Sequence, residues 1–279
     1  MDTTAATSLH AISASALHAV LGGARSPCLL DVRKAPAFDA AEFTLPGALR
    51  CAPEQVAGQL DRLRGRQVVT CCVHGHQVSQ NAAQTLRDSG IDARFLADGI
   101  EGWHEAGLPT MQKLTDCAVP AMPGQPSRWI TRERPKIDRI ACPWLIRRFI
   151  DPDAHFLYVA ADQVTGEAAR QHAIAYDVPG VRFTHRGEAC SFDAFIADFG
   201  LRDPSLDALA AIVRGADTGQ PDLTPQSAGL LAISLGLSAN FPDDHVMLEH
   251  GMVVYDALYA WIKTASGEVH NADLFRSSK

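Results

Sequence analysis

Several features that would assign this chain of 279 residues to other protein classes are missing. It has no run of about 18 apolar residues, which excludes an ordinary transmembrane helix. Its N-terminus, MDTTAATSLHAISAS, lacks the basic start and apolar stretch of a secretory signal, so we expect a cytoplasmic protein. Neither a GxGxxG nor a Walker pattern occurs, which removes the commonest nucleotide-binding loops.

Regular cysteine spacing is also missing. The seven cysteines, an odd number, argue against a disulfide framework and for reduced thiols. The net charge of −7 gives no reason to expect nucleic acid as a partner. Basic residues outnumber acidic ones only in residues 128–148, and that excess either faces an anion or forms a salt-bridged surface.

The residues that are present, 47% hydrophobic and 20% charged, suit a globular protein of two domains. Up to about Thr110, short β-type runs alternate with helical patterns, which predicts an α/β fold with a parallel sheet flanked by helices. Residues 113–127 carry prolines without periodicity and predict a linker. The runs WIT, AHFLYVA, AIAYDV and VRFTH then indicate strands, and helical patterns follow from Ser191. We expect domains at 1–112 and 128–279, the second α/β to mainly helical.

The stretch VVTCCVHGHQVSQ, residues 68–80, joins a buried strand to a helix through a loop that starts at Cys72. Open α/β sheets place ligands at the carboxyl ends of their strands. A loop curled around Gly75 can turn backbone N–H groups toward the Cys72 sulfur, and the helix adds the positive end of its dipole. Both effects stabilise the thiolate, the nucleophilic form of cysteine. We therefore predict a reactive sulfur at Cys72.

Metal binding is an alternative for this loop, because Cys72, His74 and His76 alternate as C-x-H-x-H. It fits less well, since zinc sites with four protein ligands usually draw them from two separated pairs. A disulfide between Cys71 and Cys72 is sterically awkward. Side chains alternate along a strand, so Cys71 should point to the opposite face and act as a small core residue.

Three segments of the N-terminal half resemble a rhodanese domain: LLDVRKAPAFDAAEFTLPGAL, CVHGHQV and LADGIEGWHEAGLPT. They follow the family's order within residues 9–110, and the third is the most specific. The resemblance implies a sulfurtransferase that needs no cofactor, in which Cys72 carries sulfane sulfur as a persulfide between a donor and an acceptor, each a small molecule or a protein. It assigns the substrate-binding loop to Val73, His74, Gly75, His76, Gln77 and Val78.

The loop departs from the family pattern at Gln77, where many members have an arginine. This removes a cation suited to thiosulfate, so His74 or His76 would meet the donor, or the donor would be a protein persulfide. The loop length is that of sulfurtransferases, whereas the related phosphatases and arsenate reductases have a longer loop. The alternative is a non-catalytic regulatory module, although such modules usually lack the cysteine.

The segment DRIACPWLIRRFIDP, residues 138–152, holds a second candidate site. Pro143 suits the first turn of a helix, which places Cys142 near the N-cap and predicts a lowered thiol pKa. Arg139 and Arg147 are expected to converge at that end. An oxyanion would find both charge and free amides there.

A third set of residues has the chemistry of transition-metal ligands, although no pair has a diagnostic spacing. Its members are His185, Cys190, Asp217, Glu249 and His250. His250 shares a helical stripe with Val246 and Val253, so the alternative for this histidine is a residue of the core.

Four segments of the second half resemble the C-terminal domain of chromate-resistance proteins: RPKIDRIACPWLIRRFIDPDAHFLYV, THRGEACSFDAF, IVRGADT and GMVVYDALYAW. The resemblance implies a link to chromate tolerance, and fusion to a rhodanese domain also occurs in that family. It does not imply a reaction. The site that it carries over comprises Asp138, Arg139, Cys142, Arg147, His185, Cys190 and Asp217.

Three hypotheses follow. The first is a sulfurtransferase associated with chromate resistance, whose second domain binds an acceptor or an oxyanion such as chromate. The second is a sensor or regulator of chromate or a metal, with the rhodanese domain as a platform. Direct chromate reduction by Cys72 and Cys142 is weaker, because it needs an electron donor and the chain has no nucleotide-binding loop. We select the first.

Overall fold

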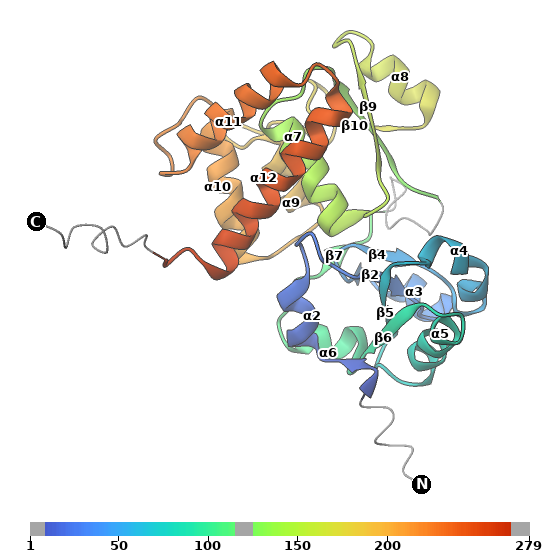
Figure 1. Ribbon diagram of the computed structural model, residues 1–279. Coiled ribbons are helices and arrows are strands. Elements are labelled where there is room, and N and C mark those ends of the chain that lie inside the picture. The colour runs from blue at the N-terminus through green and yellow to red at the C-terminus, as the bar shows by residue number, and fades with distance from the viewer. Residues whose placement is uncertain (1–8, 115–124, 269–279) are drawn as a thin grey trace, which may run out of the picture.

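A computed structural model describes residues 9–114 and 125–268 of the chain. They form two bodies that meet along one side, the N-terminal body coloured blue to green in Figure 1 and the C-terminal body lime to red. No helix in these two ranges is both long and apolar enough to cross a bilayer.

Five parallel strands form the sheet of the N-terminal body, in the order β1-β6-β5-β2-β4. Their bounds are Ala11–Ile12 (β1), Cys28–Asp31 (β2), Ala48–Arg50 (β4), Gln67–Cys71 (β5) and Asp92–Leu96 (β6). A separate antiparallel pair consists of β3 (Phe43–Thr44) and β7 (Met111–Gln112). The central strands β2 and β5 are almost entirely buried, as a parallel sheet covered on both faces requires.

Helices cover both faces of this sheet, so the expected α/β fold is confirmed. On one face α2 and α6 pack against Leu29, Val69 and Cys71, and on the other α5, α4 and the 3₁₀ helix η1 pack near Cys72. The bounds are Ala14–Val20 (α2), Ala35–Ala40 (α3), Pro53–Gln59 (η1), Leu60–Leu63 (α4), Gln77–Asp88 (α5) and Gly99–Glu105 (α6). Cys71 and Cys72 therefore face opposite layers, as strand alternation predicts.

The C-terminal body combines a smaller parallel sheet, in the order β10-β8-β9, with a group of helices. The strands are Arg128–Arg132 (β8), His155–Val159 (β9) and Ile174–Ala175 (β10). The run VRFTH, expected to be a strand, forms only a single bridge between Phe183 and Tyr176. The helices are Asp138–Leu145 (α7), Ile146–Ile150 (the π-helical turn η2), Val164–Gln171 (α8), Ser191–Asp198 (α9), Pro204–Asp217 (α10), Ser227–Asn240 (α11) and Asp244–Thr264 (α12). The expected α/β to mainly helical character is confirmed.

Helix α7 lies at the centre of the helical group and begins earlier than the sequence suggests. Pro143 lies inside it, and Cys142 is fully buried in the core, so the expected N-cap position of Cys142 is wrong. Tertiary contacts extend the helix: Tyr255 Oη donates to the Ile137 carbonyl at 2.8 Å, and the Ile137 N–H donates to Ser234 Oγ at 2.7 Å. These partners come from α12 and α11, far along the chain, and no local pattern contains them.

The two bodies contact one another directly through main-chain and side-chain hydrogen bonds. The Gly47 N–H donates to the Phe149 carbonyl at 2.7 Å, and Arg66 pairs with Asp153 at 2.7 Å. Met111 of β7 is part of the hydrophobic core of the C-terminal body. The expected linker, residues 113–127, lies mostly in residues 115–124, outside the described ranges.

Candidate functional site

Cys72 directly follows β5, at the carboxyl end of the sheet, and its loop leads into α5. The residue is only 5% exposed. Its Sγ lies 3.1 Å from Ser79 Oγ, and 3.9 Å from the His76 carbonyl oxygen. The sulfur therefore lies at the base of the loop, with a hydroxyl and a carbonyl as its described polar neighbours.

Two glycines fix the shape of this loop against the start of α6. Gly75 and Gly99 both have positive φ, +70° and +63°. A Cβ on Gly75 would lie 1.9 Å from the Ala97 carbonyl oxygen, and one on Gly99 would lie 2.3 Å from that of Val73. The Ile100 N–H donates to the Cys72 carbonyl at 2.9 Å. The segment LADGIEGW thus holds the Cys72 loop in place, because both glycines allow backbone to touch backbone.

The outer side of the loop presents polar side chains. His74, His76 and Gln77 are exposed, and the two imidazole rings lie 5.8 Å apart. Gln77 begins α5 and donates to Asn81, and Val73 and Val78 are partly buried. The exposed side chains of this loop are therefore the two histidines and Gln77.

Cys28, Cys51 and Cys71 all have buried side chains. Burial raises the pKa of the Cys28 and Cys51 thiols to about 11. It raises the pKa of the Cys71 thiol well above its ordinary value. These three thiols are suited to packing, not to nucleophilic chemistry at neutral pH.

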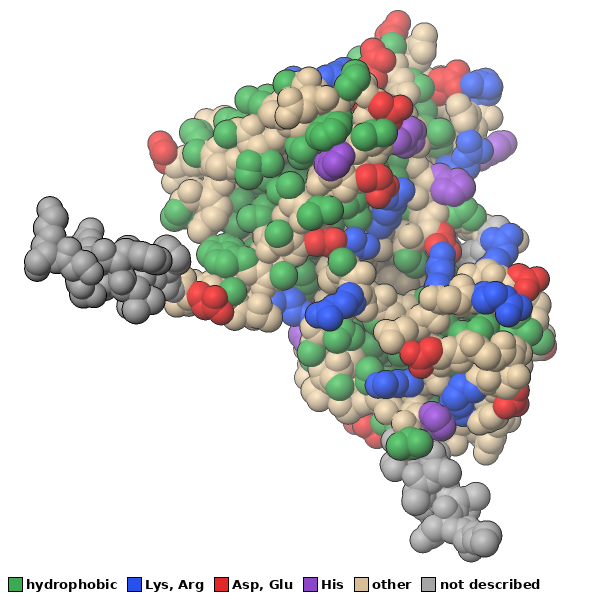
Figure 2. Space-filling view, viewed as in Figure 1, with side chains coloured by type: hydrophobic (Ala, Val, Ile, Leu, Met, Phe, Trp, Pro, Cys, Tyr) green, Lys and Arg blue, Asp and Glu red, His purple; other side chains and the backbone are tan. Residues whose placement is uncertain are grey.

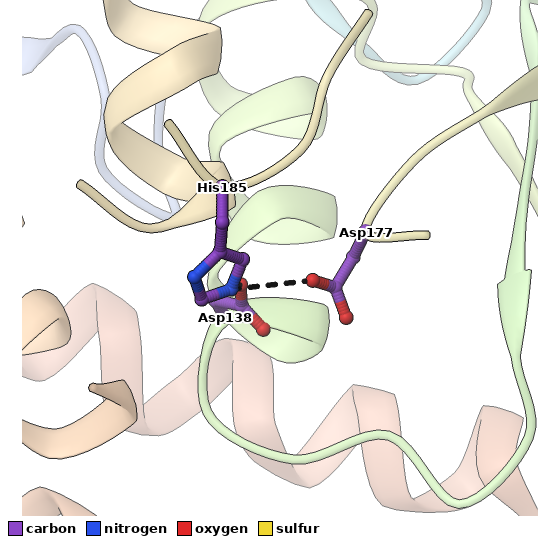
Figure 3. A group of neighbouring side chains, drawn as sticks. All are labelled: Asp138, Asp177 and His185. Carbon is purple, nitrogen blue, oxygen red and sulfur yellow. Dashed lines mark ion pairs between the residues drawn. The ribbon is translucent and has the colours of Figure 1, made fainter. Parts of the chain in front are cut away.

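A second group of chemically active side chains gathers where the strands of the C-terminal sheet end. Asp177 follows β10, Asp138 starts α7 and Asp217 ends α10. His185 Nε2 lies 3.2 Å from Asp138 Oδ2, 3.2 Å from Asp217 Oδ2 and 3.5 Å from Asp177 Oδ1. Figure 3 shows the Asp138 carboxylate against the imidazole and the Asp177 carboxylate to one side, joined to the ring by a dashed line. We call Asp138, Asp177, His185 and Asp217 the Asp-His cluster.

Charges in the Asp-His cluster strongly perturb one another. The close Asp138 carboxylate is the main reason that the pKa of His185 rises to about 9, against the opposing effect of burial. Burial, followed by the negative charge of Asp138, raises the pKa of Asp217 to about 7. Burial also raises the pKa of Asp177, although its carboxylate accepts hydrogen bonds from Arg132 Nη2 at 2.7 Å and from Ser191 Oγ at 2.8 Å.

The expected oxyanion site around Cys142 is not formed. Arg139 pairs with Asp177 at 3.2 Å, and Arg147 pairs with Glu249 at 2.7 Å, so the two arginines do not converge. Burial, with the nearby carboxylate of Asp138, raises the pKa of the Cys142 thiol well above its usual value. The prediction of a lowered pKa at Cys142 is therefore wrong, because the helix start lies upstream of the thiol.

The structure divides the expected metal-ligand set. His185, Cys190 and Asp217 gather near Asp138, but Glu249 and His250 lie elsewhere on α12. His250 is exposed and stacks on Phe241, with ring centroids 4.1 Å apart. In residues 9–114 and 125–268, each of the two groups that could hold a metal ion contains Asp138, and neither includes Cys72 or its loop histidines.

The stripe of α12 that suggested a core position for His250 faces solvent. Val246 is 48% exposed and Val253 is 66% exposed, and Figure 2 shows hydrophobic side chains at the surface over α11 and α12. The buried stripe is a different one, formed by Met247, Leu248, Gly251, Met252, Tyr255 and Tyr259. Both stripes have helical spacing, so periodicity alone does not choose between them.

Asp177 and Ser79 are site residues that the sequence interpretation missed. A signal existed for Asp177, because it directly follows the run AIAY and strand ends are where α/β sheets gather polar groups. Ser79 had none beyond its position in the first turn of α5.

Comparisons with known proteins match the two halves separately. Residues 13–106 match the rhodanese-like domain, and residues 129–262 match the C-terminal domain of ChrB. The thiosulfate sulfurtransferase GlpE of Shewanella oneidensis is 37% identical over 87 residues, which are 30% of this chain and 81% of that protein. The chain belongs to the rhodanese-like family, and its residues 129–262 are similar to the C-terminal domain of ChrB.

The second half of this fusion has a relative of its own. Protein ChrB of Cupriavidus metallidurans is 37% identical over 139 residues, which are 48% of this chain and 40% of that protein. The chain thus spans less than half the length of this ChrB. A rhodanese-related protein from Thermoplasma volcanium is 22% identical, with a TM-score of 0.32, over 36% of this chain and 96% of that one.

Proposed function

We propose that the chain is a sulfurtransferase in which Cys72 carries sulfane sulfur as a persulfide. The observation that carries the proposal is the position of Cys72 Sγ, directly after β5 at the base of a loop that Gly75 and Gly99 fix in shape. Such a loop holds one sulfur atom while leaving the donor outside, at His74, His76 and Gln77. The name of the Shewanella relative, a thiosulfate sulfurtransferase, agrees with this chemistry.

The proposed reaction has two balanced steps. The Cys72 thiolate attacks the outer sulfur of thiosulfate; a new S–S bond forms as the donor's S–S bond breaks, and sulfite leaves with the electron pair. An acceptor such as cyanide or a thiolate then attacks the outer sulfur of the persulfide and releases the Cys72 thiolate. Because Gln77 is uncharged and adds no positive charge to the outer side of the loop, we expect thiosulfate to be a weaker donor than an organic persulfide.

The test is intact-mass analysis of the full chain after treatment with thiosulfate or glutathione persulfide. We expect a gain of one sulfur atom that is removed by cyanide and that maps to Cys72. In Cys72→Ser both the gain and the transfer to cyanide should disappear, because serine cannot hold the sulfur. Cys28→Ala is the matched control, since that thiol lies on β2, outside the loop, and burial raises its pKa to about 11, so the variant should load like the wild type. Full turnover by Cys72→Ser would refute the proposal.

We further propose a biological association with chromate resistance, on the strength of the ChrB C-terminal domain. In a second candidate function, residues 128–279 sense chromate or a metal and the rhodanese-like domain is a platform. The Asp-His cluster favours a cation over chromate, because three carboxylates repel an oxyanion. Metal binding without any sulfur transfer by the full chain would select this second function.

A further inference from the structure

We propose that Asp138, His185 and Asp217 bind a divalent transition-metal ion in the C-terminal domain, with Asp177 and Cys190 at its edge. This site is separate from Cys72 and goes beyond sulfur transfer. Its residues come from three distant parts of the chain and form two groups, one of Asp138, Asp177 and His185 and the other of Asp138, Cys190 and Asp217, and the ligand atoms within each group lie within 4.8 Å of one another. His185 Nε2, 3.2 Å from Asp217 Oδ2, links the two groups.

The two distances from His185 fit ligands around one ion. His185 Nε2 lies 3.2 Å from an oxygen of each of Asp138 and Asp217. Ligand atoms bound to one zinc ion at about 2.0–2.1 Å, at tetrahedral angles, lie roughly 3.3 Å from one another. The atoms that face each other are those that bind metals, since His185 presents a ring nitrogen to both carboxylates.

Asp138 supplies an independent sign of a missing partner. The residue is only 2% exposed, and its Oδ2 is buried without a hydrogen bond from any described residue. The nearest group described for this oxygen is His185 Nε2, 3.2 Å away, which forms an ion pair with it when the imidazole is protonated. A buried carboxylate oxygen without a hydrogen bond is costly, and a coordinated cation would satisfy it.

Charge balance also favours a cation at this position. Arg132 and Arg139 form ion pairs with Asp177, so the negative charge of that carboxylate is already balanced. The ion pairs described for Asp138 and Asp217 are both with His185. A divalent ion between these two carboxylates would neutralise them, with His185 binding as neutral imidazole.

The types of ligand select the class of metal. Imidazole and carboxylate together suit zinc, iron or manganese better than calcium or magnesium, which prefer oxygen alone. Cys190 belongs to the second overlapping group, and a thiol near the site favours zinc or cobalt over manganese. We therefore choose Zn²⁺ and its spectroscopic substitute Co²⁺ as probes.

The experiment is a calorimetric titration of the full chain with Zn²⁺ after removal of metal by a chelator, together with the visible spectrum of the Co²⁺ form. We expect one ion per chain. His185→Gln and Asp138→Asn should weaken binding by about 100-fold or more, since each removes a direct ligand. Glu249→Gln and His250→Gln are the matched controls, because those residues lie on α12 away from the site, and they should bind like the wild type.

The proposal is overturned if the wild type does not bind one Zn²⁺ per chain, or if His185→Gln binds as tightly as the wild type. Equal loss in His250→Gln would also overturn it. His185 is 41% exposed, so His185→Gln gives the deciding result if Asp138→Asn does not fold. Persulfide loading of Cys72 in His185→Gln should match the wild type, which separates this result from failure of the sulfurtransferase proposal.

Discussion

At the scale of single residues, Gly75 determines the shape of the Cys72 loop. Its φ is +70°, and a Cβ there would lie 1.9 Å from the Ala97 carbonyl oxygen. We expect Gly75→Ala to lower the free energy of unfolding by about 2–5 kcal/mol, from backbone strain plus the clash, and to abolish persulfide loading. Urea denaturation and intact-mass analysis measure the two effects.

Gly65 provides the control for this prediction. Its φ is +79°, but a Cβ there would meet nothing within 4 Å. Gly65→Ala should therefore cost only the strain of positive φ, about 1–2 kcal/mol, and leave loading unchanged. Normal loading in folded Gly75→Ala would show that the loop does not need its tight contact with Ala97.

The sequence allowed Cys72 to be located because a strand, a short loop and a helix follow one another within a few residues. Cys142 was misplaced because the start of its helix depends on Ser234 and Tyr255, which lie on other helices. Proline at a first helical turn is a common signal, but tertiary packing added a turn before it. Local patterns thus predicted the position of Cys72 at the end of its strand, although the polar neighbours described for its sulfur are Ser79 Oγ and the His76 carbonyl oxygen and not the expected N–H groups. They did not predict the position of Cys142.

At the scale of elements, helix α12 carries two apolar stripes, of which one is buried. Met247 is almost fully buried in the core of the C-terminal domain, whereas Val253 is 66% exposed. We expect Met247→Ala to lower the free energy of unfolding by about 2–5 kcal/mol because it leaves a cavity. Val253→Ala, on the same helix, should change it by no more than about 0.5 kcal/mol.

Chemical denaturation of both variants of α12 measures this difference. A comparable loss of stability in Val253→Ala would mean that the exposed stripe is covered by another surface in solution. The length and position of α12 were predictable from its sequence, because its pattern is long and Asp243 caps its first turn. Its orientation was not, since that depends on which stripe meets α7.

At the scale of the whole molecule, neutral thiols are buried in both domains. The pKa of Cys28 is raised to about 11 by burial, whereas the same thiol in the unfolded chain titrates near its ordinary value of about 8.5. Above that value the unfolded state loses its proton first and binds fewer protons than the folded state. Stability should therefore fall as the pH rises from about 8.5 to about 11.

The contribution of Cys28 can be measured by urea denaturation of the wild type and Cys28→Ala at pH 8 and pH 10. Between these values, we expect the wild type to lose on the order of 1 kcal/mol more than the variant. Cys51, with a pKa also raised to about 11, should behave in the same way. An identical loss in wild type and variant would mean that the Cys28 thiol already ionises near its ordinary pKa in the folded protein.

The division into two α/β halves was predictable, because hydrophobic periodicity and proline content change along the chain. Of the Asp-His cluster, the resemblance to chromate-resistance proteins named Asp138, His185 and Asp217 in one site, but Asp177 was not named, and the four residues meet only through the fold. The sequence interpretation selected Glu249 and His250 by residue type alone. Residue types identify candidates, but only the packing of α7, α10 and the sheet shows which of them meet.

The contact between Gly47 and Phe149 has a consequence for how the two halves can diverge in evolution. It joins main chain to main chain, and a side chain on Gly47, at φ +72°, would lie 3.3 Å from the Arg148 carbonyl oxygen. This hydrogen bond therefore depends on Gly47 staying without a side chain, and the Phe149 ring adds a second such position, because a Cβ on Gly22 would lie 2.4 Å from it. The two halves can therefore diverge in sequence only while both glycines persist, since a side chain at either would push the halves apart.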